Sequence, residues 1–293
     1  MKYGVWFSHP DIGNDPTVIR DFAQAVDEAG FDRIYAAEHV VGGHPDRAGQ
    51  EKVHTNVVPY HEPFVLFGFM AAITQRIEMM TGVLVLPQRQ TALVAKQAAE
   101  VDLLSGGRLA LGVGVGRNWM EYEALNEDFR TRGRRLEEQI TVLRRLWTED
   151  YVTFEGEWHH LDRIGLNPGA VRRPIPIWMG SFRGAVVDKV LQRTARIADG
   201  WLPQFPPDDE FREVSSRFWK YVDEAGRDRS TVGMDCPVNI KKDDSPARWG
   251  AELDAFEKLG ATVVRVGTAG GGFANPLEHL DAVLRWKQFV DNR

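Results

Sequence analysis

The chain has 293 residues, a formal net charge of −6 at pH 7 and 27% charged residues, which is an ordinary globular composition. The charge is mixed along the chain, which excludes a basic nucleic-acid-binding stripe, and no stretch approaches the ~20 apolar residues of a membrane span. The single cysteine, Cys236, excludes an internal disulfide and fits a reducing compartment, so we expect a cytoplasmic protein without nucleic-acid or membrane partners.

Short apolar runs alternate with helical patterns along the first half of the chain. We predict strands at 3–8, 33–38, 77–83 and 108–113, and helices at 16–29, 63–73 and 91–104. A long polar loop, 39–60, follows the second strand. Two helices follow the fourth strand, and the second of them has apolar residues at helical spacing between Leu136 and Trp147.

The second half repeats the alternation after a small hairpin predicted at 152–161. Further strands are expected at 174–180, 199–203, 231–240 and 262–267, and further helices around 183–197, 208–225, 247–259 and 277–290. Eight strands, each followed by a helix, predict a (β/α)8 TIM-type barrel of the α/β class. We expect one domain, 1–293, with insertions after strands two and four; a doubly wound open sheet is the alternative.

The glycines at 112, 114 and 116 follow an apolar run but do not match a dinucleotide-binding loop. That fingerprint needs G-x-G-x-x-G, and the third glycine would fall on Arg117. In a barrel these glycines lie where strand four ends, at the face that carries active sites. Gly112 reads as a turn residue, whereas Gly114 and Gly116 fit equally well a tight turn or a close approach of a ligand.

Other strand ends carry candidate site residues. The first strand ends at His9, the second at Glu38-His39, and the fifth at Met179-Gly180-Ser181. A helix is expected directly after Ser181, and its free N–H groups would suit a phosphate.

Two other enzyme classes fit the strand ends poorly. The histidines of the first quarter (His9, His39, His44, His54 and His61) have no ligand-like spacing, so we predict no metal site. A glycoside hydrolase needs two facing carboxyls, and only Glu38 marks a strand end. A non-catalytic binding barrel is the alternative outside the enzymes, and the clustered polar strand ends argue against it.

Four segments carry a resemblance to a known family: "AVDEAGFDRIYAAEHV", "TGVLVLPQRQTALVAKQAAEVDLLSGGRLALGVGVG", "DFRTRGRRLEEQITVLRRLWTE" and "PIPIWMGS…RIADGWLP". Together they make the chain resemble, over about residues 3–285, the luciferase-like monooxygenase superfamily of flavin and deazaflavin barrel enzymes. The nearest likeness is to its coenzyme F420-dependent oxidoreductases. The resemblance implies a (deaza)flavin in the mouth of the barrel.

The resemblance also implies roles for particular residues. Glu38 and His39 match an acid–histidine pair beside the reactive ring, and His39 is the candidate acid or base because imidazole titrates near neutral pH. A merely cofactor-binding role for His39 is the alternative. The Gly82–Val83 bond matches a non-prolyl cis peptide behind the ring. The residues implied to bind the cofactor are Thr81, Gly82, Val83, Asn118, Met179, Gly180 and Ser181.

Two chemistries use the same pocket in such enzymes. One is hydride transfer between coenzyme F420 and a small organic substrate; the other is FMN-dependent monooxygenation, in which a separate flavin or deazaflavin reductase supplies electrons. The nearest likeness and the excess of arginine over lysine favour F420.

His9, Arg117 and Trp201 are predicted substrate-pocket residues; Arg117 stands where sugar-phosphate dehydrogenases of the family carry a carboxylate, which argues against that substrate. Relatives are often dimers, so we expect a homodimer through helix 63–73.

Overall fold

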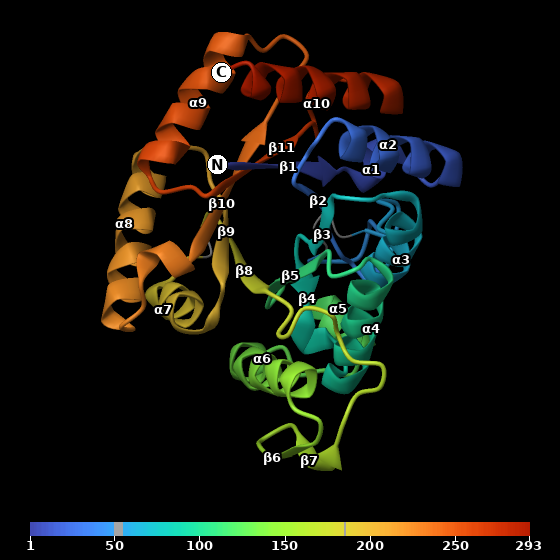
Figure 1. Ribbon diagram of the computed structural model, residues 1–293, viewed down its shortest axis with the longest axis vertical. Coiled ribbons are helices and arrows are strands. Elements are labelled where there is room, and N and C mark those ends of the chain that lie inside the picture. Colours follow the sequence, from blue (N-terminus) through green and yellow to red (C-terminus); the bar gives the residue numbers. More distant parts are fainter. Residues whose placement is uncertain (50–54, 185) are drawn as a thin grey trace. The chain divides into compact units, whose positions relative to one another are not determined.

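The computed structural model describes residues 1–49, 55–184 and 186–293. The chain has the α/β fold of a TIM-type barrel, in which parallel strands alternate with helices (Figure 1). All eight predicted barrel strands are present: β1 (Lys2–Phe7), β2 (Arg33–Ala36), β3 (Glu78–Thr81), β5 (Leu109–Gly114), β8 (Ile177–Phe182), β9 (Gly200–Gln204), β10 (Gly233–Asn239) and β11 (Val263–Gly267). The predicted fold class is therefore confirmed.

The chain forms two compact units. Unit 1 contains Met1–Ala36, Thr74–Met80 and Trp178–Arg293, and unit 2 contains Ala37–Ile73 and Thr81–Ile177. In the described parts of the chain, no helix combines the length and the apolar character that crossing a membrane requires.

Unit 1 is built on parallel strands paired in the order β2, β1, β11, β10, β9, β8. Its helices are α1 (His9–Ile12), α2 (Pro16–Glu28), α7 (Asp188–Ile197), α8 (Asp209–Glu224), α9 (Pro246–Lys258) and α10 (Pro276–Asp291), with the 3₁₀ turn η3 (Arg229–Thr231). Four of these helices begin at side chains that cap a backbone N–H: Asp15, Asp208, Ser245 and Asn275. These local signals explain why the helix starts were predictable from sequence.

Unit 2 holds the long loop 37–62 and the segment between β5 and β8. Its elements besides β5 are α3 (Pro63–Ile73), β4 (Leu84–Val85), the 3₁₀ turn η2 (Leu86–Gln88), α4 (Thr91–Leu104), α5 (Trp119–Ala124), α6 (Arg132–Thr148) and the antiparallel hairpin β6 (Val152–Glu155) and β7 (His160–Ile164). The indole N–H of Trp147 donates to the Ala95 carbonyl at 3.0 Å, which fixes α6 on α4. The predicted hairpin is confirmed, whereas β4 was not predicted because two residues carry no periodic signal.

One local expectation about the fifth barrel strand is wrong. A helix does not begin directly after Ser181: β8 continues to Phe182, and α7 begins only at Asp188. Met179 to Phe182 pair in register with Trp201 to Gln204 of β9, so the backbone there belongs to the sheet. Ser181 therefore lies within a strand and not at a helix N-terminus.

Candidate functional site

His39 follows β2 and is held by Glu121 of α5. Its Nδ1 lies 3.0 Å from Oε2 of Glu121, whose side chain is 1% exposed, while the His39 side chain is 19% exposed. An ionised carboxylate can only accept, so Nδ1 carries the proton and donates it. The other Glu121 oxygen accepts the backbone N–H of Val40 at 2.6 Å. The carboxylate therefore fixes both the tautomer and the orientation of the imidazole.

The charge of Glu121 is stabilised although the carboxyl is buried. Burial alone would raise its pKa, but the hydrogen bond and charge of His39 and the N–H of Val40 outweigh burial and hold the pKa of Glu121 below its usual value. The His39 ring also meets the ring of Tyr60 edge to face at 4.7 Å. Both rings line a pocket of about 280 Å³ formed by residues 39–42, 55–56 and 58–60.

Glu38 makes a different set of contacts from its neighbour His39. Its buried carboxylate accepts the backbone N–H of Val85 at 2.7 Å and pairs with the Arg89 guanidinium. Arg89 also lies 2.9 Å from a carboxylate oxygen of Glu62. Burial raises the pKa of Glu38, and Arg89 and the Val85 N–H oppose that rise. These contacts tie the segment after β2 to the end of β4 and to the residue that follows η2.

The segment after β3 contains the predicted cis peptide bond between Gly82 and Val83. Thr81 is fully buried, and its hydroxyl donates to the Gly112 carbonyl of β5 at 2.7 Å. Gly82 and Val83 are half-buried, unlike Thr81 and Leu84 on either side. Within this segment they are the residues that a ligand can reach.

The side chains of Val83 and Val85 pack so closely against the backbone at positions 114 and 116 that both positions require glycine. A Cβ on Gly114 would lie 2.8 Å from Cγ2 of Val83, and a Cβ on Gly116 would lie 2.6 Å from Cγ1 of Val85. Gly116 also has φ +62°, where other residues are disfavoured. Because side chains of the same chain occupy the space, packing and backbone geometry account for Gly114 and Gly116 without a ligand.

Two further predicted residues of unit 2 lie just after β5. Asn118 is buried at the start of α5, and its side chain makes no capping hydrogen bond to the helix. The Asn118 side-chain amide is thus not used to cap the start of the helix. Arg117, the neighbouring residue, is exposed.

Four of the predicted residues of unit 1 lie on β8 and β9. Ser181 Oγ accepts the indole N–H of Trp201 at 2.7 Å, which leaves the serine proton available to a second acceptor. Met179 is 3% exposed and Gly180 is half-buried. Trp201 is fully buried against Phe211 and Phe218.

The position of His9 differs from what a substrate-pocket residue requires. Its side chain is 1% exposed and its ring packs edge to face on Phe7 at 5.2 Å. Like Trp201, it is packed as a core residue, because α1 begins at His9 and turns the chain back over the strand end.

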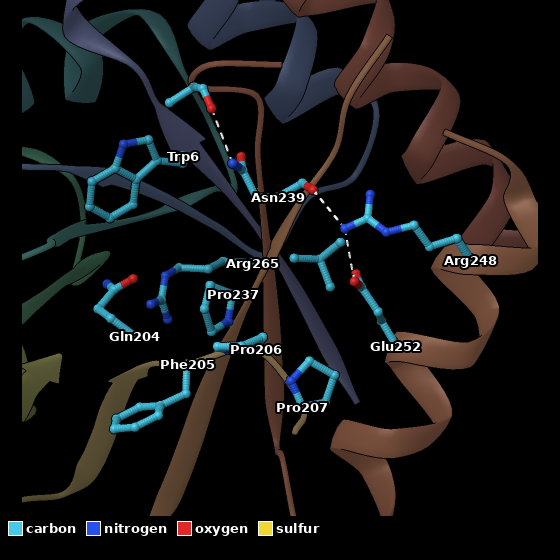
Figure 2. A pocket seen from close by; sticks show the side chains of 13 residues that line it. Trp6, Gln204, Phe205, Pro206, Pro207, Pro237, Asn239, Arg248, Glu252 and Arg265 are labelled. Carbon is cyan, nitrogen blue, oxygen red and sulfur yellow. Dashed lines mark hydrogen bonds and ion pairs between the residues drawn. The ribbon is translucent and has the colours of Figure 1, made fainter. Parts of the chain in front are cut away.

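A pocket of about 500 Å³ lies within unit 1 at the carboxyl ends of β1, β9, β10 and β11 (Figure 2), and we call it the unit 1 pocket. Its lining comprises Trp6, Gln204, Phe205, Pro206, Pro207, Pro237, Val238, Asn239, Arg248, Glu252, Arg265, Gly267 and Ala269. Its volume falls in the range of small-molecule sites, and carboxyl strand ends are where TIM barrels bind ligands.

Four residues of the contacts and pockets described above were not predicted from the sequence. Glu121 and Arg89 lie on helical or turn segments whose patterns look like ordinary polar surface, and only the fold brings them to His39 and Glu38. The one usable signal for Glu121 was its place three residues after Asn118 at the start of a helix. Asn239 and Gln204 carried a weaker signal: Asn239 is the second-last residue of a predicted strand, and Gln204 directly follows one.

Of the other histidines in the first quarter of the chain, His44 is exposed and His61 is half-buried, while His54 lies outside the described residues. Across 1–49, 55–184 and 186–293, no group of three or more His, Cys, Asp or Glu side chains is placed to hold a metal ion.

Comparison with known proteins identifies relatives along most of the chain. The family model described as luciferase-like monooxygenase matches residues 1–280. An uncharacterised protein of Mycobacterium tuberculosis is 33% identical over 227 residues, covering 75% of this chain and 77% of that protein. The F420-dependent glucose-6-phosphate dehydrogenase of Nakamurella multipartita is 30% identical over 216 residues, covering 69% of this chain and 56% of that protein.

A solved structure shows the same fold at low sequence identity. It is an F420-dependent secondary alcohol dehydrogenase in complex with an F420–acetone adduct, with a TM-score of 0.78 and 15% sequence identity over 97% of both chains. At that identity the likeness concerns the fold.

Proposed function

This chain belongs to the luciferase-like monooxygenase family, and on this premise we propose that it transfers a hydride between coenzyme F420 and a small organic substrate. Because it belongs to this family and has F420-dependent relatives, the chain is a flavin- or deazaflavin-dependent oxidoreductase. The observation that carries the proposal is the His39–Glu121 pair, a part-exposed imidazole oriented by a buried carboxylate at a carboxyl strand end.

The residues of each unit fit a deazaflavin cofactor. In unit 2, the part-exposed His39 ring, the half-buried Gly82 and Val83 and the uncommitted Asn118 amide can meet a bound ring and its polar side chain. In unit 1, the Ser181 hydroxyl, polarised by the Trp201 indole, can donate to a phosphate. The bound deazaflavin would supply the carbon that takes or gives a hydride.

We assign the proton to His39. His39 would accept the hydroxyl proton of an alcohol substrate while the bound deazaflavin supplied the hydride acceptor, and it would return the proton to the oxygen of a carbonyl substrate in the reverse direction. Glu121 stabilises the imidazolium that forms, because its carboxylate stays ionised. Glu38 acts as a positioning residue: its bonds to Val85 and Arg89 hold the backbone from which His39 projects.

Titration with two cofactors tests the proposal. We expect the full chain to bind oxidised F420 at least tenfold more tightly than FMN, measured by fluorescence. Binding of FMN alone would instead favour the family's monooxygenase chemistry, with a separate reductase supplying electrons.

A serine pair tests the phosphate contact. Ser181→Ala should weaken F420 binding about tenfold but leave the binding of the phosphate-free deazaflavin unchanged, because a charge-assisted hydrogen bond is lost. The control is Ser215→Ala on α8, whose buried hydroxyl bonds the Arg212 carbonyl. Equal losses for both deazaflavins would remove Ser181 from the phosphate site.

We also propose a homodimer through α3. Val65 and Phe69 on this apolar helix are 72% and 39% exposed. Val65→Asp together with Phe69→Asp should convert the dimer to monomer in sedimentation experiments, because the charges would have to be desolvated at the interface. A monomeric parent protein would refute this assignment.

A further inference from the structure

A second pocket lies wholly within unit 2, where α6 ends and the chain leads into the hairpin of β6 and β7 (Figure 1), and we call it the α6-end pocket. Its lining comes from two segments, one within 146–151 at the end of α6 and one within 165–173 after β7. Its volume of about 450 Å³ falls in the range of small-molecule sites.

The segment 165–173 is fastened to the amino end of β5. Arg172 donates from Nη1 to the carbonyl of Leu109, the first residue of β5, at 3.4 Å. The buried Asp102 carboxylate accepts the backbone N–H groups of Val171 and Arg172 at 2.7 and 2.8 Å. The α6-end pocket therefore lies at the end of β5 opposite to the end that α5 follows.

Arg173 supplies the pocket with a positive charge that no carboxylate neutralises. Its Nε donates to the Ala170 carbonyl at 2.9 Å, and a Cβ on Gly169 would lie 3.0 Å from its Nη2. The guanidinium is thus folded over its own segment, and the absent side chain at position 169 makes room for it. Across the parts of the chain that the structure describes, no acidic side chain pairs with Arg173, so its terminal nitrogens can bind an anion.

Asp150 supplies a negative charge that is likewise uncommitted. Its neighbour Glu149 is neutralised by Arg145, which donates from Nε and Nη2 to the two carboxylate oxygens at 2.7 and 2.8 Å. The exposed Asp150 carboxylate has no cationic partner among the described residues, Arg173 included. A Cβ on Gly165 would overlap the Asp150 carbonyl oxygen, so glycine there lets the two lining segments meet.

The remaining side chains of the lining are mostly apolar. Leu146 and Trp147 are 3% and 2% exposed, and the Trp147 indole N–H is already used by the Ala95 carbonyl. Leu166 is half-buried, whereas the Tyr151 ring is 72% exposed. A ligand that covers the Leu166 and Tyr151 side chains therefore removes apolar surface from water.

We propose that the α6-end pocket binds a free α-amino acid with an apolar side chain. Its carboxylate pairs with Arg173, its ammonium group pairs with Asp150, and its side chain packs on Leu166 and Tyr151. Two uncommitted charges of opposite sign complement a zwitterion, whereas an ion of either single sign meets one attractive and one repulsive group. The inference is independent of the proposed function, because it involves neither the cofactor nor His39.

Three matched ligands test the ligand class: phenylalanine, 3-phenylpropionate and 2-phenylethylamine. All three carry the same phenyl ring; the second lacks the ammonium group and the third lacks the carboxylate. Dissociation constants are measured by ligand-observed NMR on the full chain at pH 7. We expect phenylalanine to bind about fivefold more tightly than either single-charge ligand, because each of those forms only one of the two charge-assisted contacts.

Two charge variants test the residues. Arg173→Gln should abolish the preference for phenylalanine over 2-phenylethylamine, and Asp150→Asn should abolish the preference for phenylalanine over 3-phenylpropionate. The matched controls are Arg163→Gln and Asp162→Asn, an exposed pair on β7 outside the pocket lining. Both controls should keep the parent preferences. Melting temperatures near the parent value are expected throughout, because all four side chains are exposed.

A third variant moves the guanidinium without removing its charge. The methyl group of Gly169→Ala would lie 3.0 Å from Arg173 Nη2, so the flexible end of the arginine must shift. We expect the two ligands that carry a carboxylate to bind about threefold more weakly, because the hydrogen-bond geometry is lost. The affinity for 2-phenylethylamine should stay at the parent value, since Asp150 is unchanged.

The inference is overturned if phenylalanine shows no binding up to its solubility limit. It is equally overturned if 3-phenylpropionate or 2-phenylethylamine binds as tightly as phenylalanine, because one of the two charges would then be unused. Phenylalanine binding that survives both Arg173→Gln and Asp150→Asn unchanged would place the ligand outside the α6-end pocket and would refute the assignment.

Discussion

Each unit buries a cluster of charged side chains, and the two clusters differ in how completely they are closed. In unit 1, Asp235 of β10 joins Arg33 and Tyr35 of β2 and Arg265 of β11, and the charged side chains of these residues are 0–7% exposed. In unit 2, Glu121 and Glu38 are equally buried, at 1% each, but their partners His39 and Arg89 are 19% and 14% exposed.

The difference separates a structural network from a reactive one. Around Asp235 each ionic group meets another within the cluster, and Arg33 additionally bonds Glu78 at 2.6 Å, so the network can hold strands together but offers nothing to a ligand. Around Glu121 the carboxylate is buried and the imidazole is reachable. A buried partner that fixes an exposed ring is the arrangement that proton transfer needs.

The largest effect is expected from breaking the closed cluster. Asp235→Asn leaves the buried Arg265 guanidinium without its counter-charge and should cost about 3–5 kcal/mol of unfolding free energy, measured by urea denaturation. Asp223→Asn is the matched control, because its pair with Arg229 is about half exposed on both sides. Its midpoint should match that of the parent. Equal stability of the two variants would show that the Asp235 network is dispensable.

Breaking the open cluster should affect rate rather than stability. His39→Gln is expected to lower kcat by about 10²–10⁴-fold while shifting the urea midpoint much less than Asp235→Asn does, because the glutamine amide can still donate a hydrogen bond to the buried Glu121 carboxylate. The control is His160→Gln, whose imidazole pairs with Glu155 on the exposed hairpin. A loss confined to cofactor affinity, with single-turnover rate intact, would reduce His39 to a binding residue.

A smaller rate effect should follow from changing the partner of His39. Glu121→Leu should lower kcat by up to about 10²-fold, since a displaced imidazole loses its orientation. Glu121→Gln should restore part of the rate, because its amide oxygen still accepts from Nδ1. Nitrogen NMR shifts of His39 should show the Nδ1–H tautomer in the parent and the Gln variant and a tautomer mixture in the Leu variant. An unchanged tautomer in all three would contradict the positioning role.

The smallest effect is a pH dependence of opposite sign at the two carboxyls of unit 2. The pKa of Glu121 is lowered on folding, so its stabilisation is present above the usual glutamate value and is lost as the pH falls. The pKa of Glu38 is raised, so its contribution is present below that value and is lost as the pH rises. Between about pH 6 and pH 4 the destabilisation by Glu121→Gln should shrink on acidification, and that by Glu38→Gln should grow. Melting temperatures of the two variants that stay at a constant difference from the parent value over this pH range would refute the predicted pH dependence.

The sequence by itself determined the order of strands and helices, and hence the barrel. Each strand is a short apolar run, and helix starts carry local signals such as Asp15 with Pro16 or Asn275 with Pro276, which act over a few residues and can be read in one dimension. The resemblance of the segments around Glu38, Gly82 and Ser181 also pointed to a (deaza)flavin enzyme, and the family match bears this out.

Only the tertiary structure decided which side chains meet. Glu121 lies 82 positions after His39, and Arg89 lies 51 positions after Glu38, so no local pattern links either pair. The helix expected at Ser181 was displaced to Asp188 because pairing with β9 keeps the chain extended. Gly114 reads in sequence as a possible ligand contact, but Val83 of the same chain fills the space beside it. Packing between distant segments set these outcomes, and a one-dimensional pattern does not contain the distances on which packing depends.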